Sequence, residues 1–481
     1  MWQRGALITR GQAQLAEFNG VFVGRISCCG SLSRYIDHKM SMRADTPLFR
    51  LLTGEESDGP CRDIAETACK VEPGNFSRHV AALSASKIAD GLIDPKLVLS
   101  WLLTMLGAPA AMIGLLVPVR EAGALLPQLF TAGALRQMAK RKWAWAGAAL
   151  GQGLATLSIL ISAITLEGAA AGAAILGALG VLALCRSVAS VTHKDVLGKT
   201  VAKSRRGTAT GAAGTVGAAT VLSFGALLIA FPEQRMETVL CGLCAAGLAW
   251  IYAGFVFVRI KEDGGETEGG GNMARLALGQ LTLLKDPQLQ RFLLTRGLLI
   301  STALAPPYLV ALAAKAGGAD FEEAFGGLGL LVIASALAGL LSSYVWGRLA
   351  DVSSRKVLAL TALAASLTLG LALCLNAIGL ITAVWALPLT IFGLMIAYQG
   401  VRLGRSTHLV DMASEETRAA YTALSNTLIG FVLLAGGGFG FLAQAQGEVT
   451  VIAVFAAMSL LAVPVALSLE EVQQADGPKT G

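Results

Sequence analysis

Charged and aromatic residues are scarce in this chain. Only 15% of its 481 residues are charged and 6% are aromatic, whereas 54% are hydrophobic and the mean hydropathy is +0.63. So little charge cannot cover the surface of the soluble domains that this length would otherwise form. The composition therefore excludes a water-soluble protein and indicates an α-helical membrane protein.

Several chemical signatures are also missing. The eight cysteines lack the spacing of a secreted disulfide framework, so we predict no disulfide, and no ligand set has the spacing of a metal site. The phosphate-binding sequence GxxxxGK[ST] does not occur, and neither HExxH nor GxSxG falls on an apolar segment. We therefore expect that the protein is not an enzyme and that it binds no cofactor or metal. The net charge of +6 comes with basic residues in short loops, so we infer no nucleic acid binding.

Long apolar runs make up most of the chain. A helix needs about 20 apolar residues to cross a hydrocarbon core about 30 Å thick. Runs of this kind lie near 143–163, 168–190, 207–231, 237–259, 291–314, 325–347, 356–376, 380–402, 419–442 and 449–468. Hydropathy alone does not place the first two spans. It favours a single span at 97–119, and the residues left before the next basic loop are then too few for a second one.

An internal repeat places the first two spans. The segment Gly133–Lys142 aligns with Gly347–Lys356. Applying the same displacement to the clear spans of the second half puts the first span near 80–104 and the second near 111–135. We therefore predict an all-α membrane protein with twelve transmembrane helices in two pseudo-symmetric six-helix bundles.

Basic residues are concentrated in the loops on one side of the predicted bundles. Because positively charged loops stay in the cytoplasm, both termini are expected there, in a multi-pass protein of the inner membrane. The linker is glycine-rich, and an amphipathic stretch around Leu276–Leu284 is expected on the membrane surface. The predicted parts are an N-terminal cytoplasmic segment (1–79), a first bundle (80–259), a cytoplasmic linker (260–290), a second bundle (291–469) and a C-terminal tail (470–481).

The loop predicted between spans 8 and 9 carries a motif of small and charged residues. It reads Gly347-x-Leu349-Ala350-Asp351-x-x-x-Arg355-Lys356. This motif resembles the signature of the major facilitator superfamily. Its first-half counterpart ends in Arg141-Lys142 and has Gln137 in place of the family's Asp. The resemblance covers Phe76 to about Leu469 by span count, loop chemistry and duplication.

The resemblance implies two bundles around a central cavity and alternating access by rocking of one bundle on the other. We therefore expect a secondary active transporter, a monomeric permease that moves a small solute. The charged residues inside the spans add the expectation that transport is coupled to a proton gradient. The predicted gating residues are Gly347, Asp351, Arg355, Lys356, Arg141 and Lys142. A contact between Asp351 and Arg355 would hold the cytoplasmic gate shut. The alternative is a loop that serves only as a topology signal.

Charged residues fall inside the first two predicted spans, where each is costly unless it faces a cavity or another charge. They are Lys87, Asp90, Asp94, Lys96, Arg120 and Glu121. Lys87, Asp90 and Asp94 share one helical face, and Arg120 is expected to face Asp90 or Asp94. Asp90 or Glu121 would carry the coupled proton. The alternative is a static ion network that fixes helix packing.

The seventh predicted span contains Pro306-Pro307-Tyr308, which should interrupt the helix near its middle, and Asp94-Pro95 should interrupt the first span. Backbone groups freed there, together with Arg296, form the predicted substrate cavity. The alternative is a kink needed only for packing. Arg186 and Arg402 lie near the predicted cytoplasmic ends of their spans, so we expect them to extend to the membrane interface.

A second class of function stays open at this point. A transporter-like scaffold or sensor would bind a ligand or partner without moving solute, and the region Met40–His79 leaves room for such a partner. Transport is favoured by the charges inside the spans, because they are costly for a passive scaffold. Solute uptake into vesicles with and without a pH gradient separates the two classes.

Overall fold

The computed structural model contains helices and no strand in the part of the chain that it describes. This part comprises residues 48–53, 64, 66–128, 135, 137–264, 281–317, 327–413 and 418–473. The N-terminal segment up to residue 47 lies outside the described residues. So do the first part of the expected surface stretch Leu276–Leu284 and the end of the tail from residue 474.

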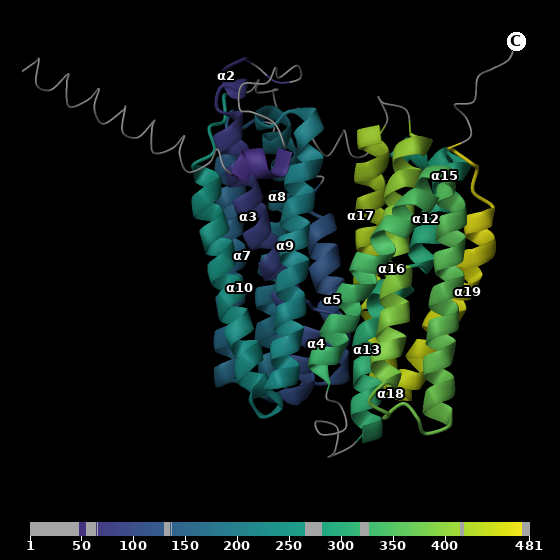
Figure 1. Ribbon diagram of the computed structural model, residues 1–481. Coiled ribbons are helices and arrows are strands. Elements are labelled where there is room, and N and C mark those ends of the chain that lie inside the picture. Colours follow the sequence, from purple (N-terminus) through teal and green to yellow (C-terminus); the bar gives the residue numbers. More distant parts are fainter. Residues whose placement is uncertain are drawn as a thin grey trace, which may run out of the picture.

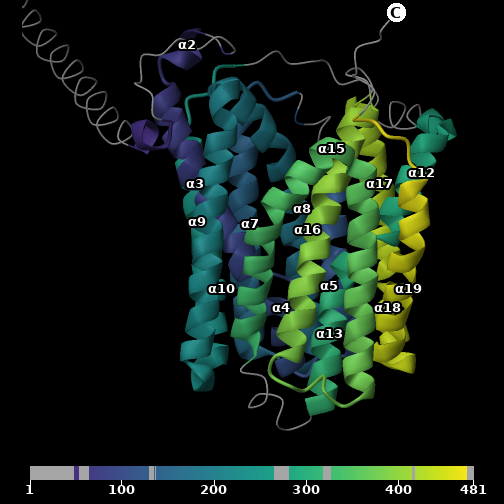
Figure 2. The same ribbon diagram turned by 45° about the vertical axis from the view of Figure 1, so that its right-hand side comes forward.

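The two halves of the chain form two helical bundles, which stand side by side in Figures 1 and 2. The first half contains α2 (Glu66–Cys69), α3 (Glu72–Leu92), α4 (Val98–Met105), α5 (Ala110–Leu125), α7 (Lys142–Thr165), α8 (Gly168–Thr200), α9 (Lys203–Ala230), η1 (Pro232–Gln234) and α10 (Arg235–Val258). The second half contains η2 (Leu281–Lys285), α12 (Pro287–Leu298), α13 (Ser301–Gly317), α15 (Leu328–Ala377), α16 (Ala386–Met412), α17 (Arg418–Gly436), α18 (Gly438–Gln446) and α19 (Glu448–Leu467).

Nine helices of the described residues are long and apolar enough to cross a membrane. The helix α15 is one of these nine, although it consists of two helices joined at Ser353, whose φ of −162° and ψ of 98° are extended. The motif expected as a loop at 347–356 is therefore helix on both sides of a one-residue kink. The chain is a multi-pass helical membrane protein, and the number of twelve spans stays a prediction.

The first predicted span is two helices and not one. The helix α3 begins at Glu72, before the expected start at residue 80, and ends at Leu92. A turn at Asp94-Pro95 separates it from α4, which begins at Val98. The break has the predicted cause, because proline cannot donate the helical hydrogen bond and clashes with the preceding turn. The charges and the break explain why hydropathy missed this span.

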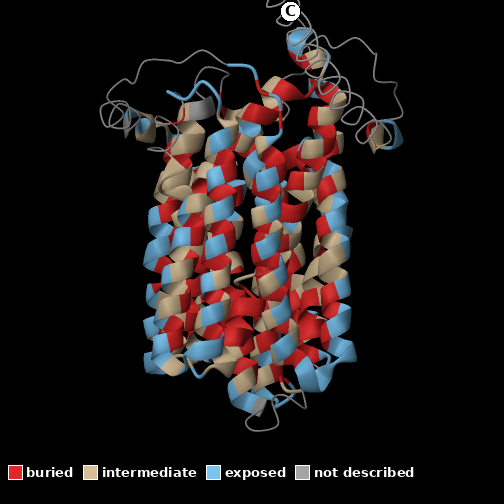
Figure 3. Cartoon of the chain, turned by 90° about the vertical axis from the view of Figure 1, so that its left-hand side faces the viewer, coloured by how far each residue is buried: buried red, intermediate tan, exposed pale blue. Residues whose placement is uncertain are grey.

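The outer faces of the bundles are apolar. Large side chains on these faces are well exposed, among them Leu367 at 65%, Ile164 at 62% and Phe441 at 62%. Figure 3 shows the exposed positions on the outer sides of the helices and the buried positions between them. Such a surface is stable against lipid chains, not water, which agrees with the membrane assignment.

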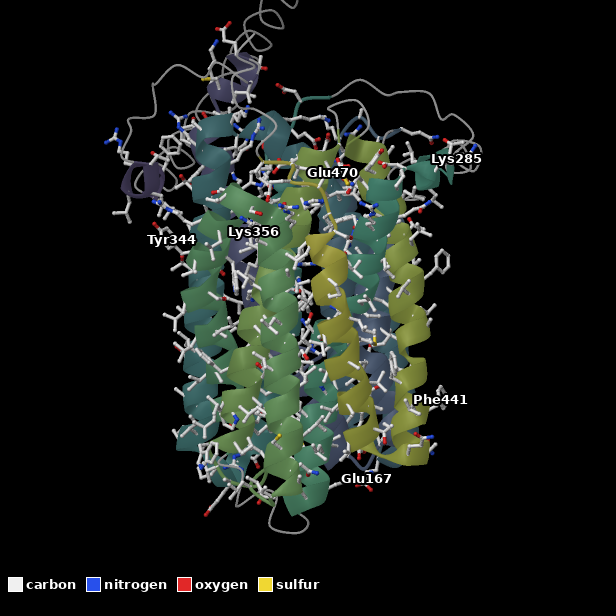
Figure 4. All side chains as sticks on the ribbon, turned by 90° about the vertical axis from the view of Figure 1, so that its right-hand side faces the viewer. Glu167, Lys285, Tyr344, Lys356, Phe441 and Glu470 are labelled. Atoms are coloured by element: carbon white, nitrogen blue, oxygen red, sulfur yellow. The ribbon has the colours of Figure 1, made fainter. Side chains whose placement is uncertain are left out.

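The two ends of the bundles can be told apart by labelled residues. Figure 4 places Lys356 and Glu470 at one end, and Glu167 and Phe441 at the opposite end. We call them the Lys356 end and the Phe441 end. By the distribution of basic residues, the Lys356 end is the predicted cytoplasmic side.

The halves touch closely near the Phe441 end, through glycines. In α15, a Cβ added to Gly329 would lie 2.6 Å from the carbonyl oxygen of Gly225 in α9. In α18, a Cβ added to Gly440 would lie 2.8 Å from the carbonyl oxygen of Ala111 in α5. Because backbone meets backbone at both places, the two halves close against each other at this end.

One expectation about the cysteines is wrong. Cys69, at the end of the short helix α2, is disulfide-bonded. The absence of the repeated cysteine spacing of a secreted framework says nothing about a single disulfide bond. The cysteines of the spans, Cys185, Cys241, Cys244 and Cys374, are free.

Candidate functional site

A cavity of about 810 Å³ lies between the two halves. We call it the central cavity. It is lined from the first half by α3, the turn after it and α9, and from the second half by α15 and α16. Its charged lining residues are Lys87, Asp94, Arg402 and Arg405. Lys87 and Asp94 were predicted from the sequence, whereas Arg402 was expected at the interface and Arg405 was not singled out.

The break between α3 and α4 shapes one wall of the central cavity. Oδ1 of Asp94 accepts hydrogen bonds from the backbone N–H groups of Lys96 at 2.7 Å and Leu97 at 3.3 Å, so its carboxylate stabilises the turn. Lys96 is buried, and its Nζ lies 3.5 Å from the ring centroid of Tyr398 in α16. This cation–π contact joins the first half to the second half.

Asp90 is the centre of a partly buried ionic cluster within the first half. Its carboxylate pairs with Arg120 of α5 at 3.0 Å and with Arg186 of α8 at 2.5 Å. The side chains are 20%, 13% and 23% exposed, respectively. Ser86 joins this Asp90 cluster by accepting hydrogen bonds from Arg186 at 3.2 Å and from the indole of Trp250 at 3.3 Å.

The predicted pairing of Arg120 with Asp90 is confirmed. The expectation for Arg186 is wrong, because this side chain turns into the bundle and does not extend to the interface. The reason is the length of α8, which continues to Thr200 beyond the predicted end at residue 190 and so leaves Arg186 well inside the helix. A buried carboxylate is then a better partner than distant water.

Glu121 faces the other way from its neighbour Arg120, as the turn of about 100° per residue predicts. It lines a second, smaller cavity of about 30 Å³, which we call the side recess. The second half contributes Arg296 of α12 and Tyr398, Arg402 and Arg405 of α16 to the same recess. Arg402 and Arg405 therefore line both cavities.

Arg296 is held by neutral partners. Only 6% of the residue is exposed, and its guanidinium donates to the hydroxyl of Ser425 and, at 3.3 Å, to Oδ1 of Asn426. Asn426 in turn donates to the side chain of Gln128 in the first half at 3.3 Å. The Nε of Arg296 has no partner among the described residues.

The proline pair of the seventh predicted span does not line either cavity. Pro306, Pro307 and Tyr308 lie inside the continuous helix α13 and are buried. The break lies earlier, at Leu299–Ile300 between α12 and α13. The carbonyls that the proline rings meet, four residues earlier, are those of Thr302 and Ala303 in the first turn of α13, so the proline pair does not lie at the break itself. Of the four predicted cavity residues, only Arg296 reaches a cavity.

The predicted gating contact takes a different form. Nε of Arg355 pairs with Glu471 at 2.9 Å and not with Asp351, which is exposed. Glu471 also accepts from Ser353, at the kink of α15, at 2.6 Å. The motif thus ties α15 to the segment after α19, within one half. Lys356 is exposed, and Gly347 has open space around it.

The first half repeats this arrangement with a different carboxylate. Glu262, just after α10, accepts from the backbone N–H groups of Arg141 at 3.1 Å and Lys142 at 2.9 Å at the start of α7. Arg141 pairs with Asp195 at 2.5 Å. Sequence reasoning missed Glu262 and Glu471. The signal that could have found them is their shared place, directly after the last helix of each half.

Comparisons with known proteins agree with the architecture. No family model and no curated protein sequence matches the chain. Among solved structures, a mutant of the nucleoside transporter NupG matches with a TM-score of 0.60 at 13% identity, covering 82% of this chain and 99% of that one. A POT family transporter in complex with 5-aminolevulinic acid matches with a TM-score of 0.57 at 12% identity, covering 82% and 95%. The chain therefore has the fold predicted from the motif, that of major facilitator transporters, and these neighbours are transporters, not enzymes.

Proposed function

We propose that this protein is a secondary active transporter that moves a small solute across the inner membrane by alternating access, driven by a proton gradient. The observation that carries the proposal is the central cavity, which lies between the halves and carries charged residues from both. A cavity at the interface of two bundles changes its opening when one bundle rocks on the other.

The contact between the halves at the Phe441 end supports a state in which the central cavity opens toward the opposite side of the membrane. The glycine contacts of Gly225 with Gly329 and of Ala111 with Gly440 seal the halves near the Phe441 end. The cavity residues of α16, Arg402 and Arg405, belong to the part of that helix closer to the Lys356 end. With both termini in the cytoplasm, the proposed state is inward-facing.

Proton coupling is assigned to Asp90, with Glu121 as the alternative carrier. In the present structure, the carboxylate of Asp90 is paired with two arginines. When rocking or solute draws one arginine away, the carboxylate loses one of its two ion pairs in a partly buried place, and this favours uptake of a proton. Return of the arginine releases it. Glu121 responds in the same way to the arginines of α16.

Transport in reconstituted vesicles tests the proposal. The first labelled probes are a nucleoside and 5-aminolevulinic acid. One similar structure is a nucleoside transporter, and the other is a transporter in complex with 5-aminolevulinic acid. We expect a pH gradient to drive accumulation, and Asp90→Asn to abolish the dependence on that gradient. Gradient-driven accumulation that is unchanged in Asp90→Asn would remove Asp90 as carrier. Ligand binding without accumulation under any gradient would favour the scaffold or sensor.

A further inference from the structure

We infer that the side recess binds the anionic group, a carboxylate or a phosphate, of an organic solute whose body lies in the central cavity. Arg296 is the principal contact, and Arg402 and Arg405 assist it. This inference rests on the proposed function, since it names the class of solute that the transporter carries.

The first argument is charge balance around the two cavities. Four cations line the cavities and a fifth contacts the ring of Tyr398 in the side recess: they are Lys87, Arg296, Arg402 and Arg405, and the fifth is Lys96. Two carboxylates line the same cavities: Asp94 and Glu121. So large an excess of positive charge at membrane depth is costly unless an anion enters.

The second argument is the geometry of Arg296. It is nearly fully buried, its described partners are a hydroxyl, an amide and the ring of Phe292 at 5.7 Å, and its Nε has no hydrogen-bond partner among the described residues. Neutral partners leave the charge uncompensated, in contrast to the carboxylate that holds Arg120 and Arg186. A guanidinium fixed in this way offers donors to an incoming oxyanion without being reoriented.

The third argument is size. The recess of about 30 Å³ is about twice the space that one water molecule needs, which suits a single oxyanion group and not a whole solute. The central cavity of about 810 Å³ has the volume of a site for a small organic molecule. Arg402 and Arg405 line both spaces, so one solute can reach from the cavity into the recess.

Glu121 reduces the positive charge of the side recess but does not cancel it. It is the only carboxylate that lines the recess among the described residues, and three arginines line it too. An oxyanion is therefore attracted on balance. A neutral solute of the same shape leaves the three arginines with Glu121 as their single carboxylate in the recess among the described residues, so the recess should discriminate against it.

Binding to the purified full-length protein tests the inference. The probes are benzoate against benzamide and phenyl phosphate against phenol, because each pair differs in the charged group alone. We expect the two anions to bind and the two neutral compounds to fail. Arg296→Gln should weaken anion binding about 30-fold, the factor that corresponds to about 2 kcal/mol for one partner of a buried charged contact.

Arg291→Gln is the matched control. Arg291 lies on the same helix, α12, but is exposed and donates to the carbonyl of Ser468 at 3.1 Å. Its loss removes the same charge and should leave anion binding unchanged. Arg296→Lys should retain part of the affinity, because it keeps the charge and loses the planar donors. Preference between benzoate and phenyl phosphate tells the carboxylate class from the phosphate class.

The outcomes separate this inference from the proposal of transport. Failure of both anions to bind at millimolar concentration overturns the inference, as does equal binding by Arg296→Gln and the Arg291→Gln control. Uptake of a neutral solute into vesicles without anion binding would overturn it while transport stands. Anion binding that depends on Arg296, without uptake or exchange in vesicles, would support the inference and overturn transport.

Discussion

The Asp90 cluster of the first half and the Arg296 site of the second half treat a buried charge in opposite ways. Asp90 has two arginine partners, at 3.0 and 2.5 Å, and is compensated within its own bundle. Arg296 has no carboxylate partner among the described residues and is held by Ser425 and Asn426. The comparison teaches that burial alone does not assign a role, because a paired carboxylate can exchange its partners, as the proposed coupling requires, whereas a charge held by neutral groups is available to a ligand.

The strongest test of this contrast is Asp90→Asn. The substitution leaves Arg120 and Arg186 facing each other without their anion, so we expect the free energy of unfolding to fall by about 2–4 kcal/mol. Chemical denaturation in detergent measures it. Ser86→Ala is the control, since it removes only hydrogen bonds from Arg186 and Trp250. Equal stability of the two variants would show that the cluster does not hold the bundle together.

The closure between the halves gives the next largest effect. In Gly440→Ala the new methyl group meets the backbone of Ala111, so α5 and α18 must separate, and the balance should shift by about 1–3 kcal/mol toward a state open at the Phe441 end. Distances between spin labels at Leu166 and Ile378 measure the opening. Gly438→Ala is the matched control, because open space surrounds that position. An identical distance distribution in both variants would contradict the assigned closure.

Arg296→Gln tests the contrast between the Asp90 cluster and the Arg296 site by a change in the second half. Because the partners of Arg296 are neutral, an amide can keep part of the hydrogen bonding, and we expect unfolding to change by only about 1 kcal/mol. The same denaturation assay in detergent applies. A loss as large as that of Asp90→Asn would make Arg296 a structural residue and remove the contrast between the two sites.

The smallest effect is expected at the kink of α15. Arg355→Gln breaks the partly exposed pair with Glu471 and should cost about 1 kcal/mol or less, whereas Asp351→Asn should cost nothing measurable. Thermal unfolding of both variants in detergent checks the order. A larger loss in Asp351→Asn would restore the contact that the sequence motif predicted.

The architecture could be predicted from the sequence to a large extent, whereas the site could be predicted only in part. The apolar runs and the repeat located the bundles, and the pairing of Arg120 with Asp90 followed from the cost of charge in lipid. The break in the seventh span was placed at Pro306 but lies at Leu299–Ile300. Arg186 was assigned to the interface because the end of α8 was placed too early.

The sequence by itself determined that this chain is a doubled bundle of membrane helices, because the length of an apolar run and the charge of a loop are local properties of consecutive residues. Only the tertiary structure decided which charges are satisfied. Asp90, Arg120 and Arg186 come from three helices, and Arg296 meets α17 and α16 across the packed core. The strength of an ionic contact depends on distance and burial, and both are set by segments far apart in the chain.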